Sequence, residues 1–166
     1  PEAGSLSGTR LLFFSDLHIR PQTCSSFLPN FLKLKWNGLE MIQRQLLAAC
    51  EEFRPDHLIF GGDMMAFACS YPDVVRFFHS LNPKKCKLGV YGNWDRMRSW
   101  FPSHEWEKGL ESASLKLLVN REFRVDGIRF FGMDDFRRGN PMYFKAEQKP
   151  LFECVLAHNP DTIPLT

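Results

Sequence analysis

The sequence lacks the features that mark membrane-spanning, disulfide-rich and repetitive proteins. No apolar run reaches the ~18 uninterrupted residues that a membrane-spanning helix needs, because a charged residue, Pro or Gly interrupts each run. The five cysteines form no C-x-x-C pair, and we interpret them as reduced packing residues rather than a disulfide framework or zinc knuckle. No internal repeat, low-complexity tract or linker is present. We therefore expect one soluble folded domain over residues 1–166.

A large excess of charge of one sign is also lacking. The 21 Lys and Arg residues against 19 Asp and Glu residues give a formal charge of +2, which is too small to indicate a nucleic-acid partner. With 44% hydrophobic residues, a chain of 166 residues can bury enough surface to fold without a staple. Because the chain begins at Pro1 rather than Met, an upstream anchor stays open, and the expected location is cytoplasmic or membrane-associated.

Short apolar segments that alternate with helical patterns predict an α/β fold. A helical stripe runs from Leu39 to Phe53 and stops before Pro55, and a shorter helix is expected around Asp73–Leu81. Asp126-Gly127 favours a hairpin turn between strands at 121–125 and 128–131. The other expected strands are residues 11–14, 57–60, 87–91 and 152–157.

Polar residues follow four of these expected strands directly. The clusters are Ser15-Asp16-Leu17-His18, Gly61-Gly62-Asp63, Gly92-Asn93-Trp94-Asp95 and His158-Asn159-Pro160. Because parallel strands end at one edge of a sheet, these side chains should converge, and Asp16 and His18 should face one side of an extended segment. Mixed carboxylate, amide and imidazole ligands suit manganese, iron or zinc. Each cluster alone is also typical of an ordinary turn, so the prediction depends on the set.

In this order, the clusters resemble the signature of the calcineurin-like metallophosphoesterases. That signature is D-x-H, G-D, G-N-H-D/E, a lone His and then G-H-x-H, and the resemblance extends from about Leu11 to about Pro164. Residues 132–135 and 156–161 look like the branch of phosphodiesterases and lipid-precursor pyrophosphatases, whose members are often membrane-associated. The resemblance implies a four-layer α-β-β-α sandwich, of which the C-terminal part is missing here.

The resemblance also implies a site for two divalent metal ions, with manganese preferred and iron or zinc as alternatives. Asp16 and His18 would hold the first ion, Asp63 would bridge both, and Asn93 and His158 would hold the second. Asp95 would orient a ligand or a neighbouring donor from behind the site. The implied activity is hydrolysis of a phosphoester by a metal-bridging hydroxide. A lipid-linked substrate and a membrane surface remain open as partners.

Trp94 is the first departure from the family pattern, which has a histidine at this position. An indole N–H donates a hydrogen bond but cannot shuttle a proton. The leaving group must then be protonated by another group or depart without help. A pyrophosphate is more acidic than an alkoxide, and we therefore favour a phosphodiester or pyrophosphate substrate over an alkyl monoester.

The second departure is that no G-H-x-H occurs before Thr166. In the family, this motif supplies one further histidine to each metal. His57, His79 and His104 do not replace it, because none is followed by a second histidine two places on. We expect weaker metal binding than at a complete site, and we hypothesise that the chain is a truncated form of a longer enzyme.

Several other residues are weaker candidates. Arg96 and Arg98 could reach a phosphate but more often would be solvated, and Asp134-Asp135 favours a turn or helix cap over a carboxylate pair. Four aromatic residues could form an apolar rim for a lipid tail or could pack in the core, namely Trp36, Trp100, Phe101 and Trp106. Residues 27–36 could form a membrane-facing patch or an insertion packed on the domain.

The expected function is metal-dependent phosphoester hydrolysis. The alternative is a catalytically incompetent relative that serves as a binding or interaction module, having lost part of its site through Trp94 and the absent histidines. A nucleotide-binding domain without metal chemistry is disfavoured, because no Gly-rich phosphate loop follows the first expected strand.

Overall fold

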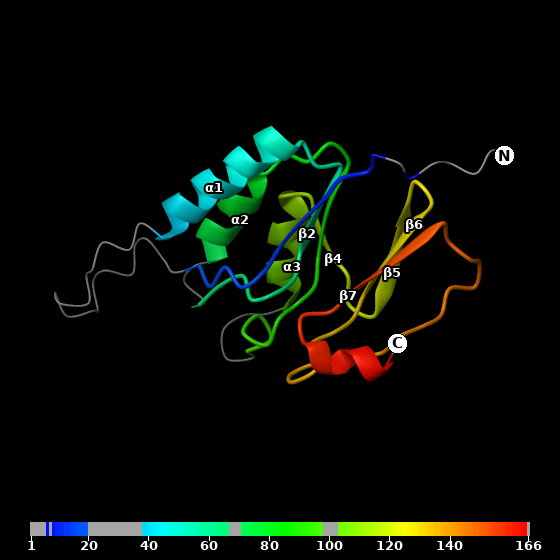
Figure 1. The fold of residues 1–166 in the computed structure, drawn as a ribbon. Coiled ribbons are helices and arrows are strands. Elements are labelled where there is room, and N and C mark those ends of the chain that lie inside the picture. Colours follow the sequence, from blue (N-terminus) through cyan, green and yellow to red (C-terminus); the bar gives the residue numbers. More distant parts are fainter. Residues whose placement is uncertain (1–5, 7, 20–37, 67–70, 98–102, 166) are drawn as a thin grey trace.

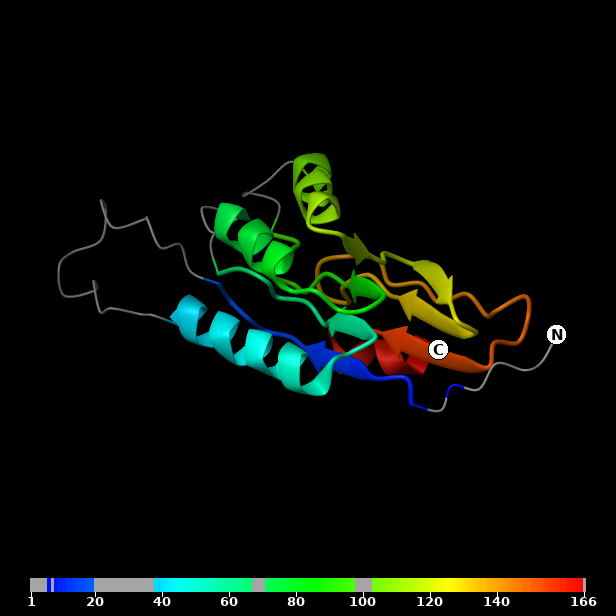
Figure 2. The same cartoon turned by 90° about the horizontal axis from the view of Figure 1, so that it is seen from above.

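Helices, a parallel sheet and a second sheet form three successive layers. The computed structural model describes residues 6, 8–19, 38–66, 71–97 and 103–165. The three α-helices of the described residues lie on one side of the first sheet and the second sheet lies on the other (Figures 1 and 2). Among the helices of this described part, none is long and apolar enough to cross a bilayer. The predicted α/β class is confirmed.

The first sheet contains four parallel strands in the order in which they occur along the chain. They are β1 (Leu11–Phe14), β2 (His57–Phe60), β3 (Cys86–Gly89) and β4 (Leu115–Leu117). All four residues of β2 are buried, as expected for a strand covered on both faces. Since the strands are parallel, the loops after β1, β2 and β3 leave the same edge, which we call the carboxyl edge.

The helices α1 (Gly38–Phe53) and α2 (Tyr71–Ser80) correspond to the two predicted helices. After α1, Arg54 adopts a φ of +47° and Pro55 prevents further helix, as the sequence indicated. The second helix begins two residues earlier than predicted, with Pro72 in its first turn. Their apolar faces pack on the first sheet together with the strand residues of the helix-side core, which includes Leu58, Phe60, Val74, Phe77, Phe78, Leu110 and Leu117.

Three elements of the described residues were not predicted, namely α3 (Ser103–Ser112), β4 and the 3-10 helix η4 (Pro160–Leu165). Trp106, Leu110 and Ala113 are buried at helical spacing, so a periodic signal was present. It is weak because polar residues dominate the helix. In β4, exposed Lys116 separates buried Leu115 and Leu117, but three residues are too few to stand out as a strand in a sequence.

The second sheet combines the predicted hairpin with the last predicted strand. Strands β5 (Arg121–Val125) and β6 (Ile128–Gly132) are antiparallel, and Asp126 and Gly127 between them have φ of +52° and +79°. Strand β7 (Phe152–Leu156) pairs with β6 in parallel. The inner face of this sheet packs on the first sheet through a second core that includes Ile59, Leu88, Val90, Leu118, Ile128, Phe130 and Leu156.

A buried arginine organises the outer face of the second sheet. Arg129 is 1% exposed, and its guanidinium donates to the carboxylates of Glu122 and Glu153 and to the carbonyl of Phe144. It also lies over the ring of Phe131. These contacts satisfy the buried charge and tie the long segment between β6 and β7 to the sheet, which explains why β6 is buried on both faces.

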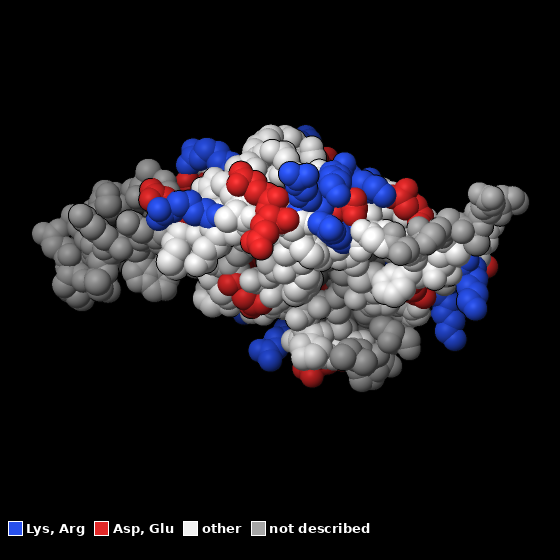
Figure 3. All heavy atoms as spheres, turned by 45° about the horizontal axis from the view of Figure 1, so that its top comes forward, with Lys and Arg blue, Asp and Glu red and all other residues white. Residues whose placement is uncertain are grey.

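Opposite charges are interspersed at the edge where the parallel strands begin, which we call the amino edge. Figure 3 brings this edge forward and shows Lys and Arg side chains next to Asp and Glu. Lys84 pairs with Asp56 at 3.5 Å, and Lys85 pairs with Asp126 at 2.5 Å. Such exposed pairs contribute little free energy each, and the side chains on this face do not form one continuous area of a single sign.

Candidate metal centre

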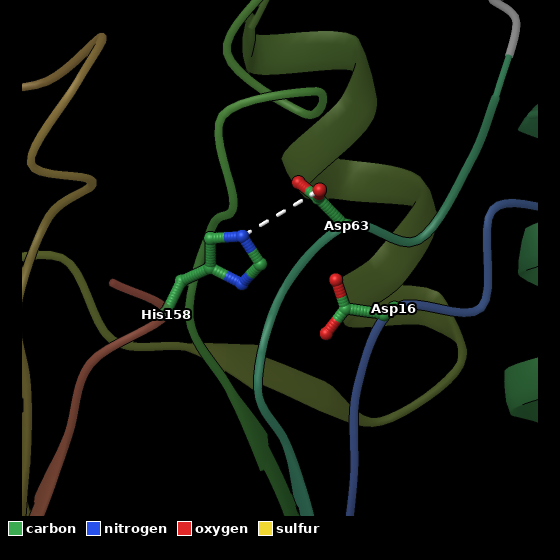
Figure 4. Close-up of side chains that lie close together, drawn as sticks. All are labelled: Asp16, Asp63 and His158. Carbon is green, nitrogen blue, oxygen red and sulfur yellow. Dashed lines mark ion pairs between the residues drawn. The ribbon is translucent and has the colours of Figure 1, made fainter. Parts of the chain in front are cut away.

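Three predicted ligands from three separate strand ends meet at the carboxyl edge. Asp16 follows β1, Asp63 follows β2 and His158 follows β7, and each offers a ligand atom within 4.8 Å of the others (Figure 4). The His158 ring points towards the Asp63 carboxylate, with 3.5 Å between His158 Nε2 and Asp63 Oδ2. The structure therefore brings together residues that lie up to 142 positions apart.

His18 also lies close to Asp63 and Asp16. Its Nε2 atom lies 3.6 Å from Asp63 Oδ2 and 3.9 Å from Asp16 Oδ1. One carboxylate oxygen of Asp63 is thus close to two imidazoles. The other oxygen, Oδ1, accepts the backbone N–H of Trp94 at 2.9 Å.

The backbone at these ligands is held in a strained conformation. Asp16, His18 and Asp63 have φ of +56°, +42° and +59°, in the left-handed region that costs non-Gly residues about 1–3 kcal/mol each. The expected extended geometry for Asp16 and His18 was therefore wrong. Both side chains still reach Asp63, because the N–H groups of Asp16 and His18 bond to the carbonyls of Gly62 and Asp63 at 2.9 and 3.1 Å.

A backbone carbonyl orients the His158 ring. His158 Nδ1 lies 2.8 Å from the carbonyl oxygen of Gly61, which fixes Nδ1 as the protonated nitrogen and directs Nε2 towards Asp63. Metal-binding histidines commonly have this kind of partner. The hydrogen bond to Asp63 raises the pKa of His158 to about 9 despite the opposing effect of burial. A cation would have to displace this proton.

Asp95 braces the loops that carry Asp63. Its Oδ2 accepts the N–H groups of Asp63 and Gly92 at 2.8 and 2.9 Å, and its Oδ1 accepts the N–H of Met64 at 2.9 Å. Burial raises the pKa of Asp95 to about 7, although these three donors favour the ionised form. With its oxygens directed at backbone donors, Asp95 acts as a positioning residue.

Gly92 allows the third loop to approach Asp63 closely. A Cβ atom at Gly92 would lie 2.0 Å from Asp63 Oδ1, a separation that no side chain could adopt. Asn93, the predicted amide ligand, is half-buried and lies between Gly92 and Trp94, both of which approach Asp63. The indole of Trp94 stands at 85° to the His18 ring, with 5.4 Å between ring centroids, and Trp94 is 37% exposed.

Within the described residues, the exposed part of the cluster is formed by Asp16 and His18. The side chains of Asp16 and His18 are 56% and 38% exposed, whereas those of His158 and Asp63 are 11% and 4% exposed. A ligand from solution would therefore reach the cluster past Asp16, His18 and Trp94.

The donor set fits a divalent cation. Ligand atoms bound to one ion at about 2.0–2.2 Å lie roughly 3.0–3.5 Å apart, and the closest imidazole and carboxylate atoms here are 3.5–3.9 Å apart. Two carboxylates and two imidazoles suit manganese, iron or zinc. The fixed His158 nitrogen and the braced Asp63 provide the support that such a site needs.

The weaker sequence candidates have structural partners. The Arg96 guanidinium donates to Asp134 at 2.5 Å and lies over Tyr91, so it links the Asn93 loop to the second sheet. Asp134 and Asp135 hold the turn after β6 by accepting N–H groups of Asn140 and Arg138, as the favoured turn interpretation predicted. Trp106 is a core residue. Arg98, Trp36, Trp100, Phe101 and residues 27–36 lie outside the described residues.

Sequence reasoning missed two features of the site. The Gly61 carbonyl that orients His158 and the three N–H groups that converge on Asp95 are backbone atoms, and backbone atoms carry no sequence signal. The glycines at 61 and 62 were the only local hint, because they permit close approach.

Comparisons with known proteins assign no family to this chain. No protein-family model matches the chain, and no curated protein matches it. Among solved structures, a protein of unknown function from Aquifex aeolicus is similar, with 18% identity and a TM-score of 0.42. The match covers 80% of this chain and spans 63% of that protein. A similarity this low supports no argument on fold or function.

Proposed function

We propose that this protein is a metal-dependent phosphoesterase that hydrolyses a phosphodiester or pyrophosphate bond. The observation that carries the proposal is the position of Asp63 Oδ2, which lies 3.5 and 3.6 Å from the Nε2 atoms of His158 and His18. A carboxylate oxygen that lies close to two imidazole nitrogens is suited to be a ligand that two cations share. When bound, two such cations supply Lewis acidity to a phosphoryl oxygen and lower the pKa of a water molecule.

Each residue of the cluster would have its own role in holding the two ions. Asp16 and His18 would hold one ion at the solvent-exposed side, and His158 with Asn93 would hold the other at the buried side. Asp63 would bind both, and the backbone N–H of Trp94 donates to its Oδ1 atom and so holds the carboxylate in place. Asp95 would maintain the spacing of the two loops by accepting their N–H groups.

The surroundings of the cluster favour an acidic leaving group. Trp94 occupies the loop position beside His18, and its indole moves no proton. Asp95 is directed at three backbone donors and away from the opening, so it is not placed to protonate a leaving group. A diester or pyrophosphate with a weakly basic leaving group avoids this requirement.

We also propose that the fold is part of a metallophosphoesterase sandwich. The helices, the first sheet and the second sheet would correspond to three layers of a four-layer α-β-β-α metallophosphoesterase sandwich. The support is the order of strands and the position of each polar cluster after its strand.

Manganese-dependent turnover tests the proposal. With Mn²⁺, the wild type should bind the ion in a calorimeter and hydrolyse bis-p-nitrophenyl phosphate. Asp63→Asn should lower the rate by on the order of 100-fold or more, because it removes the shared charge. Asp126→Asn is the matched control, since Asp126 occupies a hairpin turn at the amino edge and Asn tolerates its φ of +52°.

Two results would decide against hydrolysis. If the wild type binds no Mn²⁺, or if Asp63→Asn retains full turnover, the metal-site proposal is wrong. If the wild type binds Mn²⁺ at the site but turns over no diester or pyrophosphate, the binding-module alternative is favoured.

A further inference from the structure

The candidate metal centre takes its ligands from both sheets. Asp16, His18 and Asp63 follow strands of the first sheet, whereas His158 follows β7 of the second sheet. A change in the separation of the two sheets at this edge would change the distance between His158 Nε2 and Asp63 Oδ2, which is 3.5 Å. Metal–ligand distances vary by only about 0.2 Å in a well-formed site, so the separation of the sheets has to be set closely.

An ion pair joins the two sheets at the same edge. Arg96 lies in the turn after β3 of the first sheet, and its Nε and Nη2 atoms donate to Asp134 Oδ1 at 2.9 and 2.5 Å. Asp134 lies two residues beyond the end of β6 in the second sheet. The side chains of Arg96 and Asp134 are 27% and 9% exposed. Salt screens such a partly buried pair less than an exposed one, so it can hold the two loops together.

In the second sheet, the positions of Asp134 and His158 are linked by strand pairing. Gly132 and Leu156 are register partners in β6 and β7, and Asp134 and His158 each follow two residues later. The N–H of Met133 donates to the carbonyl of Leu156 at 2.8 Å, so the pairing continues beyond Gly132. The Asp134 carboxylate also accepts two backbone N–H groups of its own turn. Asp134 therefore cannot move far without moving His158.

In the first sheet, Arg96 is held at a fixed position relative to Asp63. The preceding residue, Asp95, accepts the N–H groups of Asp63 and Gly92 at 2.8 and 2.9 Å. The Arg96 guanidinium lies over the ring of Tyr91, with 4.6 Å between Cζ and the ring centroid, and Tyr91 is buried. These contacts limit the positions that the guanidinium can take.

We propose that Arg96 and Asp134 are positioning residues that set the distance between His158 and Asp63, and thereby the affinity of the site for a divalent cation. This inference rests on the proposed function. The apolar core between the sheets holds them together farther from the ligands, whereas the ion pair acts at the edge where the ligands lie. Arg96 is itself a cation, so by charge alone it would repel a metal ion, and a role in spacing accounts for its position in this loop.

The experiment measures the affinity of each variant for Mn²⁺ by calorimetry. Arg96→Met and Asp134→Asn should each lower the affinity by about tenfold, the lower end of the range for residues that support metal ligands. An effect of charge alone predicts opposite signs, because loss of a cation strengthens Mn²⁺ binding and loss of an anion weakens it. The direction of the change in Arg96→Met therefore decides between spacing and charge.

Three further variants test whether the two residues act as a pair. The double variant Arg96→Met/Asp134→Asn should lose no more affinity than the weaker-binding single variant, because each change breaks the same contact. Arg96→Lys keeps the charge but not the planar fork, and should show an intermediate loss. Arg121→Met is the matched control, because Arg121 of β5 donates to the Leu117 carbonyl of β4 and so also joins the two sheets. Its affinity should stay close to that of the wild type.

Unfolding in urea with a chelator present shows which variants fold. The inference is overturned if Arg96→Met binds Mn²⁺ as tightly as the wild type or more tightly, or if the losses in the double variant are additive. A loss in Arg121→Met as large as that in Arg96→Met also overturns it, because any loosening of the sheets would then suffice. If Arg96→Met does not fold, Arg96→Lys decides, and an unchanged affinity in this variant overturns the inference.

The outcomes separate this inference from the proposed function. In each case above, the metal site stands as long as the wild type binds Mn²⁺. If the wild type binds Mn²⁺ but hydrolyses neither a diester nor a pyrophosphate, the phosphoesterase proposal fails, and the affinities alone decide the role of Arg96 and Asp134. If the wild type binds no Mn²⁺, both proposals are wrong.

Discussion

The two edges of the parallel sheet each contain a histidine in a protected position, and the two differ in what surrounds them. At the amino edge, His57 is fully buried, its Nδ1 lies 2.9 Å from Cys86 Sγ, and its ring packs on Phe130. At the carboxyl edge, His158 lies between the Gly61 carbonyl and the Asp63 carboxylate. Burial lowers the pKa of His57, whereas Asp63 raises that of His158 to about 9.

The comparison teaches that burial by itself does not make a histidine a metal-ligand candidate. The His57 ring contacts Cys86 and Phe130, and its Nε2 atom has no hydrogen-bond partner within the described residues. In His158, the Gly61 carbonyl orients the ring through Nδ1, and Nε2 faces the Asp63 carboxylate, with which it could bind the same cation. The backbone differs as well, since the ligand loops at the carboxyl edge contain three non-Gly residues with positive φ.

The largest expected contrast is in metal affinity. His158→Leu should lower the affinity for Mn²⁺ by on the order of 100-fold, because it removes a ligand from the buried side of the site. His57→Leu should leave this affinity unchanged, because no predicted ligand lies beside it. Isothermal titration at neutral pH measures both constants. The comparison fails if His57→Leu weakens binding as much as His158→Leu does.

A smaller contrast is expected between two carboxylates that accept backbone N–H groups. Asp95→Asn should reduce Mn²⁺ affinity by about ten- to hundredfold, since its amide cannot accept all three N–H groups that Asp95 now accepts. Asp56→Asn is the matched change at the amino edge, where Asp56 accepts the N–H of Arg10 at 2.9 Å. Titration of both variants should show a loss for Asp95→Asn alone. Equal affinities would mean that the bracing of Asp63 is not needed for metal binding.

A third contrast, in a different quantity, is expected in stability as a function of pH in the metal-free protein. The folded-state pKa of His158 is raised to about 9, so its contribution is present below pH 6.5 and is lost as the pH rises towards 9. The folded-state pKa of His57 is lowered, so its contribution is present above pH 6.5 and is lost as the pH falls. Each slope is at most ~1.4 kcal/mol per pH unit, because one proton is involved.

Urea unfolding with a chelator present, from pH 5 to 9.5, measures these slopes. The advantage of the wild type over His158→Leu should shrink on the alkaline side, and its advantage over His57→Leu should shrink on the acidic side. Slopes of the same sign for both variants would show that the two edges do not differ electrostatically in this way.

Sequence patterns predicted secondary structure correctly where it depends mainly on the residues of the segment itself. The runs at 11–14, 57–60 and 152–156 formed strands at or near the predicted bounds, and Asp126-Gly127 formed the hairpin turn because both residues accept positive φ. The elements α3 and β4 were missed because their apolar residues are few and acquire their meaning only when packed on neighbours. Propensity is a weak guide for such short segments.

The candidate site shows the same division. The prediction that Asp16, Asp63 and His158 would meet agrees with the structure. Its reason, a shared edge of one parallel sheet, applies to Asp16 and Asp63 but not to His158, because β7 belongs to the second sheet and approaches through the packing of the two sheets. The conformation of Asp16 and His18 was predicted wrongly. Hydrogen bonds to Gly62 and Asp63, which come from a distant segment, impose a left-handed backbone that a local pattern does not reveal.

The sequence by itself therefore determined which chemical groups are available and at which strand ends they stand. Only the tertiary structure decided that Oδ2 of Asp63 lies close to two imidazoles, that Nδ1 of His158 is held by a carbonyl, and that the Trp94 indole contacts the His18 ring. The physical reason is that these features depend on distances between atoms of segments far apart in the chain. Such distances are set by strand pairing and core packing, and they have no counterpart in the local order of residues.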